Sequence, residues 1–168
     1  AVGVPLVRHA AVDVVCFIGS EPTGRRIGSV CGEALKKCVL ELGGNDAMIV
    51  DETASPSGAA RLAALAAFEN SGQICTSTER IYVHSSIADS FVQSLVAEAD
   101  KLRVGSGFDP NSQLGPLIDA DHLRKVSSHV DDAVAQGAVV RGNRLHSNSP
   151  GYFYRPTVLT NVDHGMIV

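Results

Sequence analysis

The sequence predicts an α/β fold in which strands and helices alternate along the chain. Short apolar runs, such as the valine-rich residues 11–18 and the shorter residues 39–42, have the length and composition of strands. Longer amphipathic segments, such as residues 86–102, repeat apolar side chains at helical spacing. Glycine, proline and serine separate the two kinds of segment. Such alternation is typical of layered α/β proteins.

The first 43 residues predict one β-α-β unit. Residues 11–18 form an apolar strand, broken only by Asp13, that we expect to be largely buried as in a parallel sheet. Thr23 and Gly24 open a helix with a single apolar stripe. A second strand follows at residues 39–42. The stripe consists of Ile27, Val30, Cys31, Ala34 and Leu35.

The rest of the chain continues the alternation. Ser55 and Pro56 are typical of a helix start, with serine as the cap and proline in the first turn. This helix is expected to run to about Asn70, and Ser86 is a candidate cap for the next one. The other expected elements are strands at 47–50, 80–84, 138–141 and 157–159, a helix at 119–136, a loop at 105–117 and a polar turn region at 142–151.

Composition narrows the class of protein. A chain of 168 residues with 45 % apolar and 19 % charged residues is expected to be globular and about one domain in size. The net charge of −4 argues against a nucleic-acid partner. No apolar run approaches the ~20 residues that span a bilayer, so no membrane partner is expected.

The four cysteines indicate neither a disulfide framework nor a metal site. They form no CxxC pair, and no histidine stands at ligand spacing from them. Cys16 and Cys31 lie in apolar segments, where we expect them to be small buried hydrophobes. A reducing, cytoplasmic setting fits this pattern.

Cys75 is the candidate nucleophile. It lies on the predicted connection between a helix and a strand, next to Gly72, Gln73 and Thr76. A loop at a helix end offers exposure and backbone N–H donors for an oxyanion. An unreactive loop cysteine is the alternative.

Glu41 is the candidate base. It interrupts an apolar strand, so its carboxylate lies either on a solvated strand face or in a dry cleft, where it could act as a base near neutral pH. Gly19, Ser20 and Gly24 stand between a strand and a helix. Their N–H groups could bind an anion, or they could form a plain turn.

Five ordered segments together resemble the aldehyde dehydrogenase superfamily. They cover nearly the whole chain in the order that the family shows. They are Phe17-Ile18-Gly19-Ser20 with Gly24, Leu40-Glu41-Leu42-Gly43-Gly44, Asn70-Ser71-Gly72-Gln73-Ile74-Cys75, Gly115-Pro116-Leu117-Ile118, and Gly151-Tyr152-Phe153-Tyr154-Arg155-Pro156-Thr157.

The resemblance implies part of a three-layer α/β sandwich. Residues 1–43 would be the C-terminal part of a Rossmann-like NAD(P)-binding domain, and residues 44–168 an incomplete catalytic domain. Cys75 would attack an aldehyde, and Glu41 would activate the water that hydrolyses the resulting thioester. NAD or NADP would lie along Gly19, Ser20, Gly24, Leu42 and Gly43. No metal is implied, and the full-length enzyme would be a homo-oligomer.

The sequence departs from the family at Ile18, where threonine is usual, and at Asn45, where lysine is common. The family's oxyanion asparagine and its ribose ligands would lie outside residues 1–168. Two alternatives therefore stay open: a cofactor-independent esterase that uses Cys75 and Glu41, and a chain that is inactive by itself. A coenzyme-A-acylating enzyme is a further rival, and Glu41 argues against it.

Overall fold

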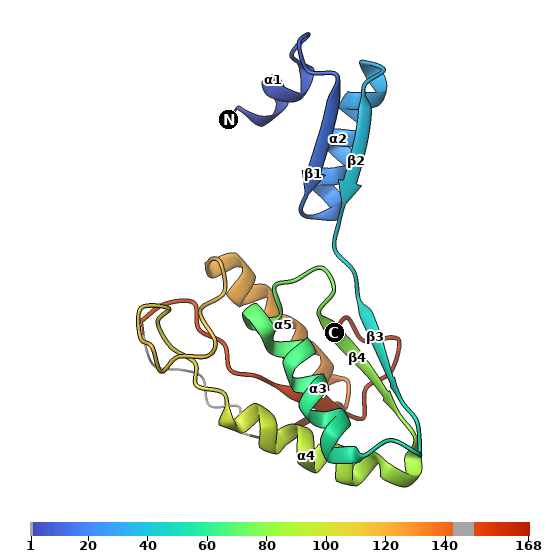
Figure 1. Cartoon of the computed structure of the whole chain (residues 1–168), viewed down its shortest axis with the longest axis vertical. Coiled ribbons are helices and arrows are strands. Elements are labelled where there is room, and N and C mark those ends of the chain that lie inside the picture. Colours follow the sequence, from blue (N-terminus) through green and yellow to red (C-terminus); the bar gives the residue numbers. More distant parts are fainter. Residues whose placement is uncertain (1, 143–149) are drawn as a thin grey trace. The chain divides into compact units, whose positions relative to one another are not determined.

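The computed structural model describes residues 2–142 and 150–168. Contacts within the chain divide it into two compact units, Ala1–Gly44 and Asn45–Val168. Figure 1 traces the chain through both, from blue to red. Within the described residues, no helix combines the length and apolar character that a membrane crossing needs.

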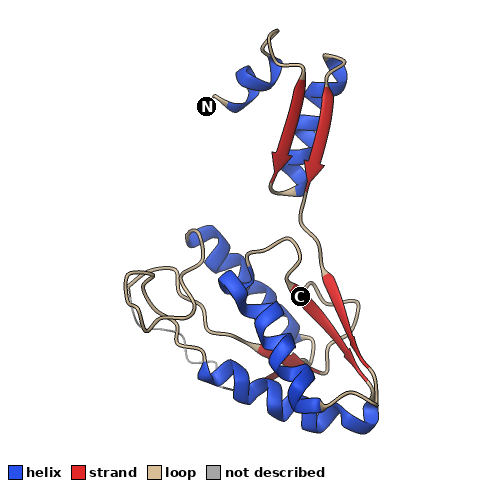
Figure 2. Ribbon diagram, viewed as in Figure 1, coloured by secondary structure: helices blue, strands red, loops and turns tan. Residues whose placement is uncertain are grey.

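The first unit contains the expected β-α-β arrangement. Strands β1 and β2 run parallel, with Val14 opposite Lys37 and Ile18 opposite Glu41. Helix α2 connects them and lies along their sheet (Figure 2). A short helix, α1, precedes them and was not expected. The bounds are α1 Gly3–Arg8, β1 Val14–Ile18, α2 Glu21–Glu33 and β2 Lys37–Glu41.

Close packing of α2 on β2 and on Leu42 depends on Gly24. A Cβ atom added at Gly24 would lie 2.5 Å from Cδ2 of Leu42, and one added at Gly28 would lie 3.5 Å from Cδ1 of Leu40. Because glycine has no side chain, the helix backbone can approach closely at Gly24, whereas the 3.5 Å at Gly28 is an ordinary contact distance. Val30 and Cys31 complete the buried stripe farther along the helix.

The expectation of a largely buried first strand is wrong. Burial alternates along β1, with Val14 54 % exposed and Ile18 75 % exposed. Successive side chains of a strand point to opposite faces, and only the face towards α2 is covered within this unit. Cys16 lies on the other face and is exposed, which corrects its expected burial, whereas Cys31 is buried as expected.

The second unit begins with another parallel crossover. Strands β3 and β4 pair in parallel with Val50 opposite Val83, while β5 and β6 form an antiparallel pair. Helices α3 and α4 pack against each other. The bounds are β3 Asp46–Val50, α3 Pro56–Phe68, η1 Glu69–Gly72, β4 Thr78–Val83, η2 Ser85–Ile87, α4 Ala88–Lys101, α5 Ala120–Ala135, β5 Val139–Arg141 and β6 Val158–Thr160.

The main core of this unit joins α3, α4 and the end of β3. Alanines of α3 allow the two helices to approach closely, and Phe91 fills the centre with 1 % of its surface exposed. The buried cluster consists of Val50, Ala60, Ala63, Ala64, Phe91, Leu95, Ala99 and Val158.

Helix starts were predicted with mixed success. Ser55 caps α3 as expected, because its Oγ accepts a 3.4 Å hydrogen bond from the N–H of Gly58. Ser86 does not cap α4, which begins at Ala88 after a short 3₁₀ turn. The N–H of Ser86 donates instead to Nδ1 of His84. Most of the polar turn region expected at 142–151 lies outside the described residues.

Candidate active site

Cys75 lies on an exposed loop between η1 and β4. The chain reverses sharply before it. Asn70, Ser71 and Gly72 are three consecutive residues with positive φ angles of 51°, 59° and 74°. Positive φ is uncommon outside glycine and costs free energy that surrounding contacts must offset. The loop that presents Cys75 therefore has a specific conformation that needs anchoring.

Ser71 and Gln73 supply that anchoring. The Ser71 hydroxyl donates a 2.9 Å hydrogen bond to the carbonyl of Gly115. The Gln73 side-chain amide donates to the carbonyl of Pro116 at 3.4 Å and accepts from the N–H of Ile118 at 2.9 Å. These bonds tie the cysteine loop to a segment more than 40 residues farther along the chain.

Ser77 fixes the other side of the loop. It is 4 % exposed, and its hydroxyl donates to the carbonyls of Ala66 and Ala67 at 3.2 and 3.1 Å. These carbonyls belong to the last turn of α3, where intrahelical partners are lacking. The N–H of Ser77 donates to the carbonyl of Ile74 and closes the turn around Cys75.

A third family-like segment joins the same network. The N–H of Leu117 donates a 2.8 Å hydrogen bond to the carbonyl of Tyr152. The segments at 70–77, 115–118 and 151–157 therefore meet within the second unit, although they are far apart in the sequence. The anchoring roles of Ser71 and Gln73 were not predicted. Their polar side chains beside a candidate nucleophile were the available signal.

Glu41 and the candidate cofactor residues lie in the first unit. Glu41 is the last residue of β2, and its carbonyl accepts a 3.1 Å hydrogen bond from the N–H of Gly19. Its side chain is exposed, so within this unit the solvated alternative describes it. The bond joins the carboxyl ends of both strands, which is the edge where doubly wound sheets bind ligands.

The candidate cofactor residues surround that edge. Ser20 precedes α2, and its hydroxyl donates to Oγ1 of Thr23 at 3.1 Å. Gly24 is buried against Leu42, and Gly43 is exposed. The first unit thus brings together all five candidate cofactor residues and Glu41, whereas Cys75 belongs to the second unit. Among the described residues, no three side chains of His, Cys, Asp or Glu are grouped as metal ligands.

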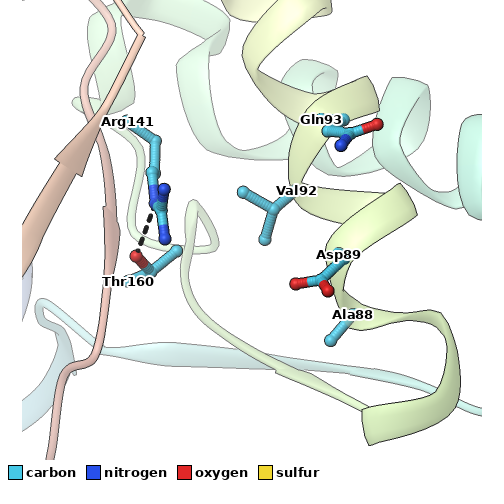
Figure 3. Close-up of a pocket in the computed structure, with 6 residues that line it drawn as sticks. All are labelled: Ala88, Asp89, Val92, Gln93, Arg141 and Thr160. Atoms are coloured by element: carbon cyan, nitrogen blue, oxygen red, sulfur yellow. Dashed lines mark hydrogen bonds between the residues drawn. The ribbon is translucent and has the colours of Figure 1, made fainter.

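A pocket of about 310 Å³ lies elsewhere in the second unit. Its wall contains no residue of the Cys75 loop. Arg141 points into it from β5 and donates from Nε to Oγ1 of Thr160 at 3.0 Å (Figure 3). The lining residues are Ala88, Asp89, Val92, Gln93, Arg141 and Thr160.

Comparison with known proteins decides the family. Residues 1–168 match the model of the aldehyde dehydrogenase family. This chain belongs to that family. The resemblance inferred from the five motifs is therefore confirmed.

Curated members of the aldehyde dehydrogenase family align over nearly the whole chain. A succinate-semialdehyde dehydrogenase [NADP(+)] of Mycobacterium tuberculosis is 38 % identical and covers 96 % of this chain. A probable succinate-semialdehyde dehydrogenase [NADP(+)] of Sinorhizobium fredii is 39 % identical and covers 99 %. The chain spans 35 % and 34 % of the length of these two relatives.

Solved structures confirm the fold class. Succinate-semialdehyde dehydrogenase from Burkholderia pseudomallei superposes with a TM-score of 0.93 at 36 % identity, over 99 % of this chain and 35 % of that one. Betaine aldehyde dehydrogenase from Staphylococcus aureus, solved with NAD⁺, gives 0.90 at 35 % identity, over 98 % and 34 %. The structure is accordingly part of an aldehyde dehydrogenase fold.

Proposed function

We propose that this chain supplies the nucleophile and the water-activating carboxylate of an NAD(P)-dependent aldehyde dehydrogenase. The observation that carries the proposal is the presentation of Cys75, exposed on a strained loop that Ser71 and Gln73 hold in place. A strained and well-anchored loop is frequent at functional sites. The two units are assigned as the end of the cofactor domain, residues 1–43, and an incomplete catalytic domain, residues 44–168.

In the proposed reaction, the Cys75 thiolate attacks the aldehyde carbon and forms a thiohemiacetal. A backbone N–H beside Cys75 donates to the developing oxyanion. Loss of a hydride from the thiohemiacetal carbon leaves a thioester on Cys75. Glu41 then takes a proton from water, and the resulting hydroxide releases the carboxylic acid and frees the cysteine.

The residues at the carboxyl edge of β1 and β2 fit a nicotinamide dinucleotide. Gly19, Ser20 and Gly24 lie at the N-terminus of α2, where the helix dipole favours a phosphate. The N–H groups of Gly19 and Gly24 already donate to the carbonyls of Glu41 and Ser20, so they are not themselves donors to that phosphate. Leu42 and Gly43 extend this surface beyond β2. The bound cofactor would supply the hydride acceptor. Solved relatives are described in complex with NAD⁺ and with NAP, so both NAD and NADP are proposed.

The names of the relatives suggest a first substrate. Several curated relatives are NADP⁺-dependent succinate-semialdehyde dehydrogenases, so we propose a small aldehyde such as succinate semialdehyde. We also propose that the full-length protein is a homo-oligomer. A cytoplasmic location is proposed as well, supported by four cysteines that are all free.

The test is cofactor reduction by a full-length protein that carries this chain. We expect succinate semialdehyde to reduce NADP⁺ or NAD⁺ with the wild-type protein and not with Cys75→Ser. Activity that survives Cys75→Ser would overturn the assignment of the nucleophile. Hydrolysis of an activated ester without cofactor, together with no aldehyde oxidation, would favour the esterase alternative.

The chain of 168 residues by itself is expected to bind cofactor very weakly and to oxidise no aldehyde. A dinucleotide site is built across several strand ends of a doubly wound sheet, and the first unit contributes only β1 and β2. Calorimetric titration with NAD and NADP tests this expectation. A micromolar dissociation constant would contradict it.

A further inference from the structure

Alternate residues of β2, together with Leu42 just after it, face α2. Leu42 lies against Gly24, and Leu40 lies against Gly28. Two residues along a strand advance about 6.6 Å, and four residues along a helix advance about 6 Å, so the two rows stay in step. The row on β2 continues backwards from Leu40 to Cys38 on the same face.

The matching row on α2 continues to Cys31. Gly24, Gly28 and Cys31 stand at i, i+4 and i+7, which is one face of a helix. Cys31 is 1 % exposed, and Cys38 is half-buried. The backbone agrees with this pairing, because the carbonyl of Cys31 accepts a 2.9 Å hydrogen bond from the N–H of Lys36, two residues before Cys38.

The raised pKa of Cys38 is consistent with a position next to Cys31. Burial raises the pKa of the Cys38 thiol, and the neighbouring Cys31 thiol and, to a smaller extent, the Cys16 thiol raise it further.

We propose that Cys31 and Cys38 are a redox pair that closes a disulfide between α2 and β2 when the protein meets a peroxide. Cys38 is the more accessible of the two thiols and reacts first, although its raised pKa lowers the fraction of thiolate and slows this step. Its thiolate attacks a peroxide oxygen and becomes a sulfenic acid, and the peroxide O–O bond breaks to give one water. The Cys31 sulfur then attacks the sulfenic sulfur, and the second water leaves. Two thiols have lost two electrons and two protons, and one hydrogen peroxide has become two waters.

The disulfide would link the helix to the strand that ends at Glu41. The covalent bond encloses residues 31–38 and fixes the packing of α2 on β2. Cys16 is the natural comparison. It lies on β1 opposite Val39, but on the face turned away from α2, and it should not take part.

Tryptic mapping tests the proposal directly, because Lys36 and Lys37 separate the two cysteines. Treatment of the folded 168-residue chain with hydrogen peroxide should join the peptides 27–36 and 38–61 into one species that lacks two hydrogen atoms and is split by a dithiol. Cys16 and Cys75 lie in two other tryptic peptides, 9–25 and 62–80, so their oxidation is detected separately. The same cross-link should form in Cys16→Ser and Cys75→Ser.

Cys31→Ser should leave a sulfenic acid on Cys38 that dimedone traps. The wild-type comparison remains decisive even if a variant does not fold. Oxidation in urea should give a mixture of cysteine pairs, and oxidation of the folded chain should enrich the Cys31–Cys38 pair over that mixture. Recovery of peptides 27–36 and 38–61 as separately alkylated species after peroxide treatment would overturn the proposal. The same conclusion would follow if the folded chain gave the same mixture as urea.

Discussion

The N–H of Ile118 donates a 2.9 Å hydrogen bond to the side-chain oxygen of Gln73. This bond spans 45 residues of sequence, and the amide nitrogen of the same side chain donates to the carbonyls of Asn70 and Pro116. Gln73 thus connects the loop of Cys75 both to its own left-handed turn and to a distant segment. Gln73 therefore shares the presentation of the candidate nucleophile with Ser71 and Ser77.

Gln73→Ala should loosen the cysteine loop. Each lost hydrogen bond contributes about 1 kcal/mol, and because Gln73 is exposed we expect the free energy of unfolding to fall by only about 1 kcal/mol in total. Hydrogen exchange should become faster at residues 70–77 and 115–118 together. Gln136→Ala is a suitable control, since the side-chain amide of Gln136 donates to the carboxylate of Asp132 one turn away and not to a distant segment among the described residues. Unchanged exchange in both segments would show that Gln73 is not their connection.

Ser77→Ala should destabilise the second unit more than an exposed serine change does. Its buried hydroxyl satisfies two carbonyls at the end of α3, and loss of a buried partner costs about 1–3 kcal/mol. Ser128→Ala removes a comparable bond to the carbonyl of Lys125 from an exposed helix surface and should change stability by less than about 0.5 kcal/mol. Urea unfolding of both variants measures the difference. Equal losses in the free energy of unfolding of the two variants would mean that burial does not strengthen the contribution of the Ser77 hydroxyl.

Cys75 should react with iodoacetamide faster than the other three cysteines. It lies on an exposed loop, whereas Cys31 is buried and Cys38 is half-buried. Cys16 is the informative competitor, because it is also exposed but lies in a strand. Brief labelling followed by peptide mapping ranks the four thiols. Preferential labelling of Cys31 would show that the packing of α2 is wrong, and preferential labelling of Cys16 would show that exposure alone governs the reaction.

Asp119 should stabilise helix α5 in a pH-dependent way. Its pKa is lowered, first by the hydrogen bond from the N–H of His122 and then by one with the His122 side chain. A lowered folded-state pKa means that the stabilisation is present above the usual aspartate pKa of about 3.9 and is lost as the pH falls through the lower folded-state value.

The substitution Asp119→Asn keeps a capping oxygen without the charge and serves as the matched control. The thermal midpoint of the wild type should exceed that of Asp119→Asn at neutral pH, and the difference should shrink as the pH falls below 4, about the usual aspartate pKa. A difference that is constant with pH would contradict the charge-based explanation.

Local sequence signals predicted where helices and strands lie better than they predicted which side chains are buried. Ser55 and Pro56 mark the start of α3 because capping is a property of neighbouring residues. The burial of residues 11–18 was misjudged because exposure depends on which face of a sheet another element covers. The composition of the strand itself does not contain that information.

The candidate site was likewise predictable only in part: its motifs were recognisable, and its long-range contacts were not. The motifs around Glu41 and Cys75 were recognisable as short patterns, and the family match agrees with them. The left-handed conformation of Ser71 was not predictable from its residue type, since only glycine and asparagine adopt it readily. The bond from Ser71 to Gly115 spans 44 residues and has no local signature.

The most direct test of the proposed function is the substitution Glu41→Gln in a full-length protein that carries this chain. Glutamine keeps the shape of the side chain and cannot accept the proton of water. Rapid mixing with aldehyde and NAD(P) should then give a burst of about one reduced cofactor per site, followed by turnover slowed roughly 10²–10⁴-fold. Cys75→Ser should give no burst. Steady turnover at the wild-type rate, or complete loss of the burst in a folded Glu41→Gln protein, would contradict the role of Glu41 in thioester hydrolysis.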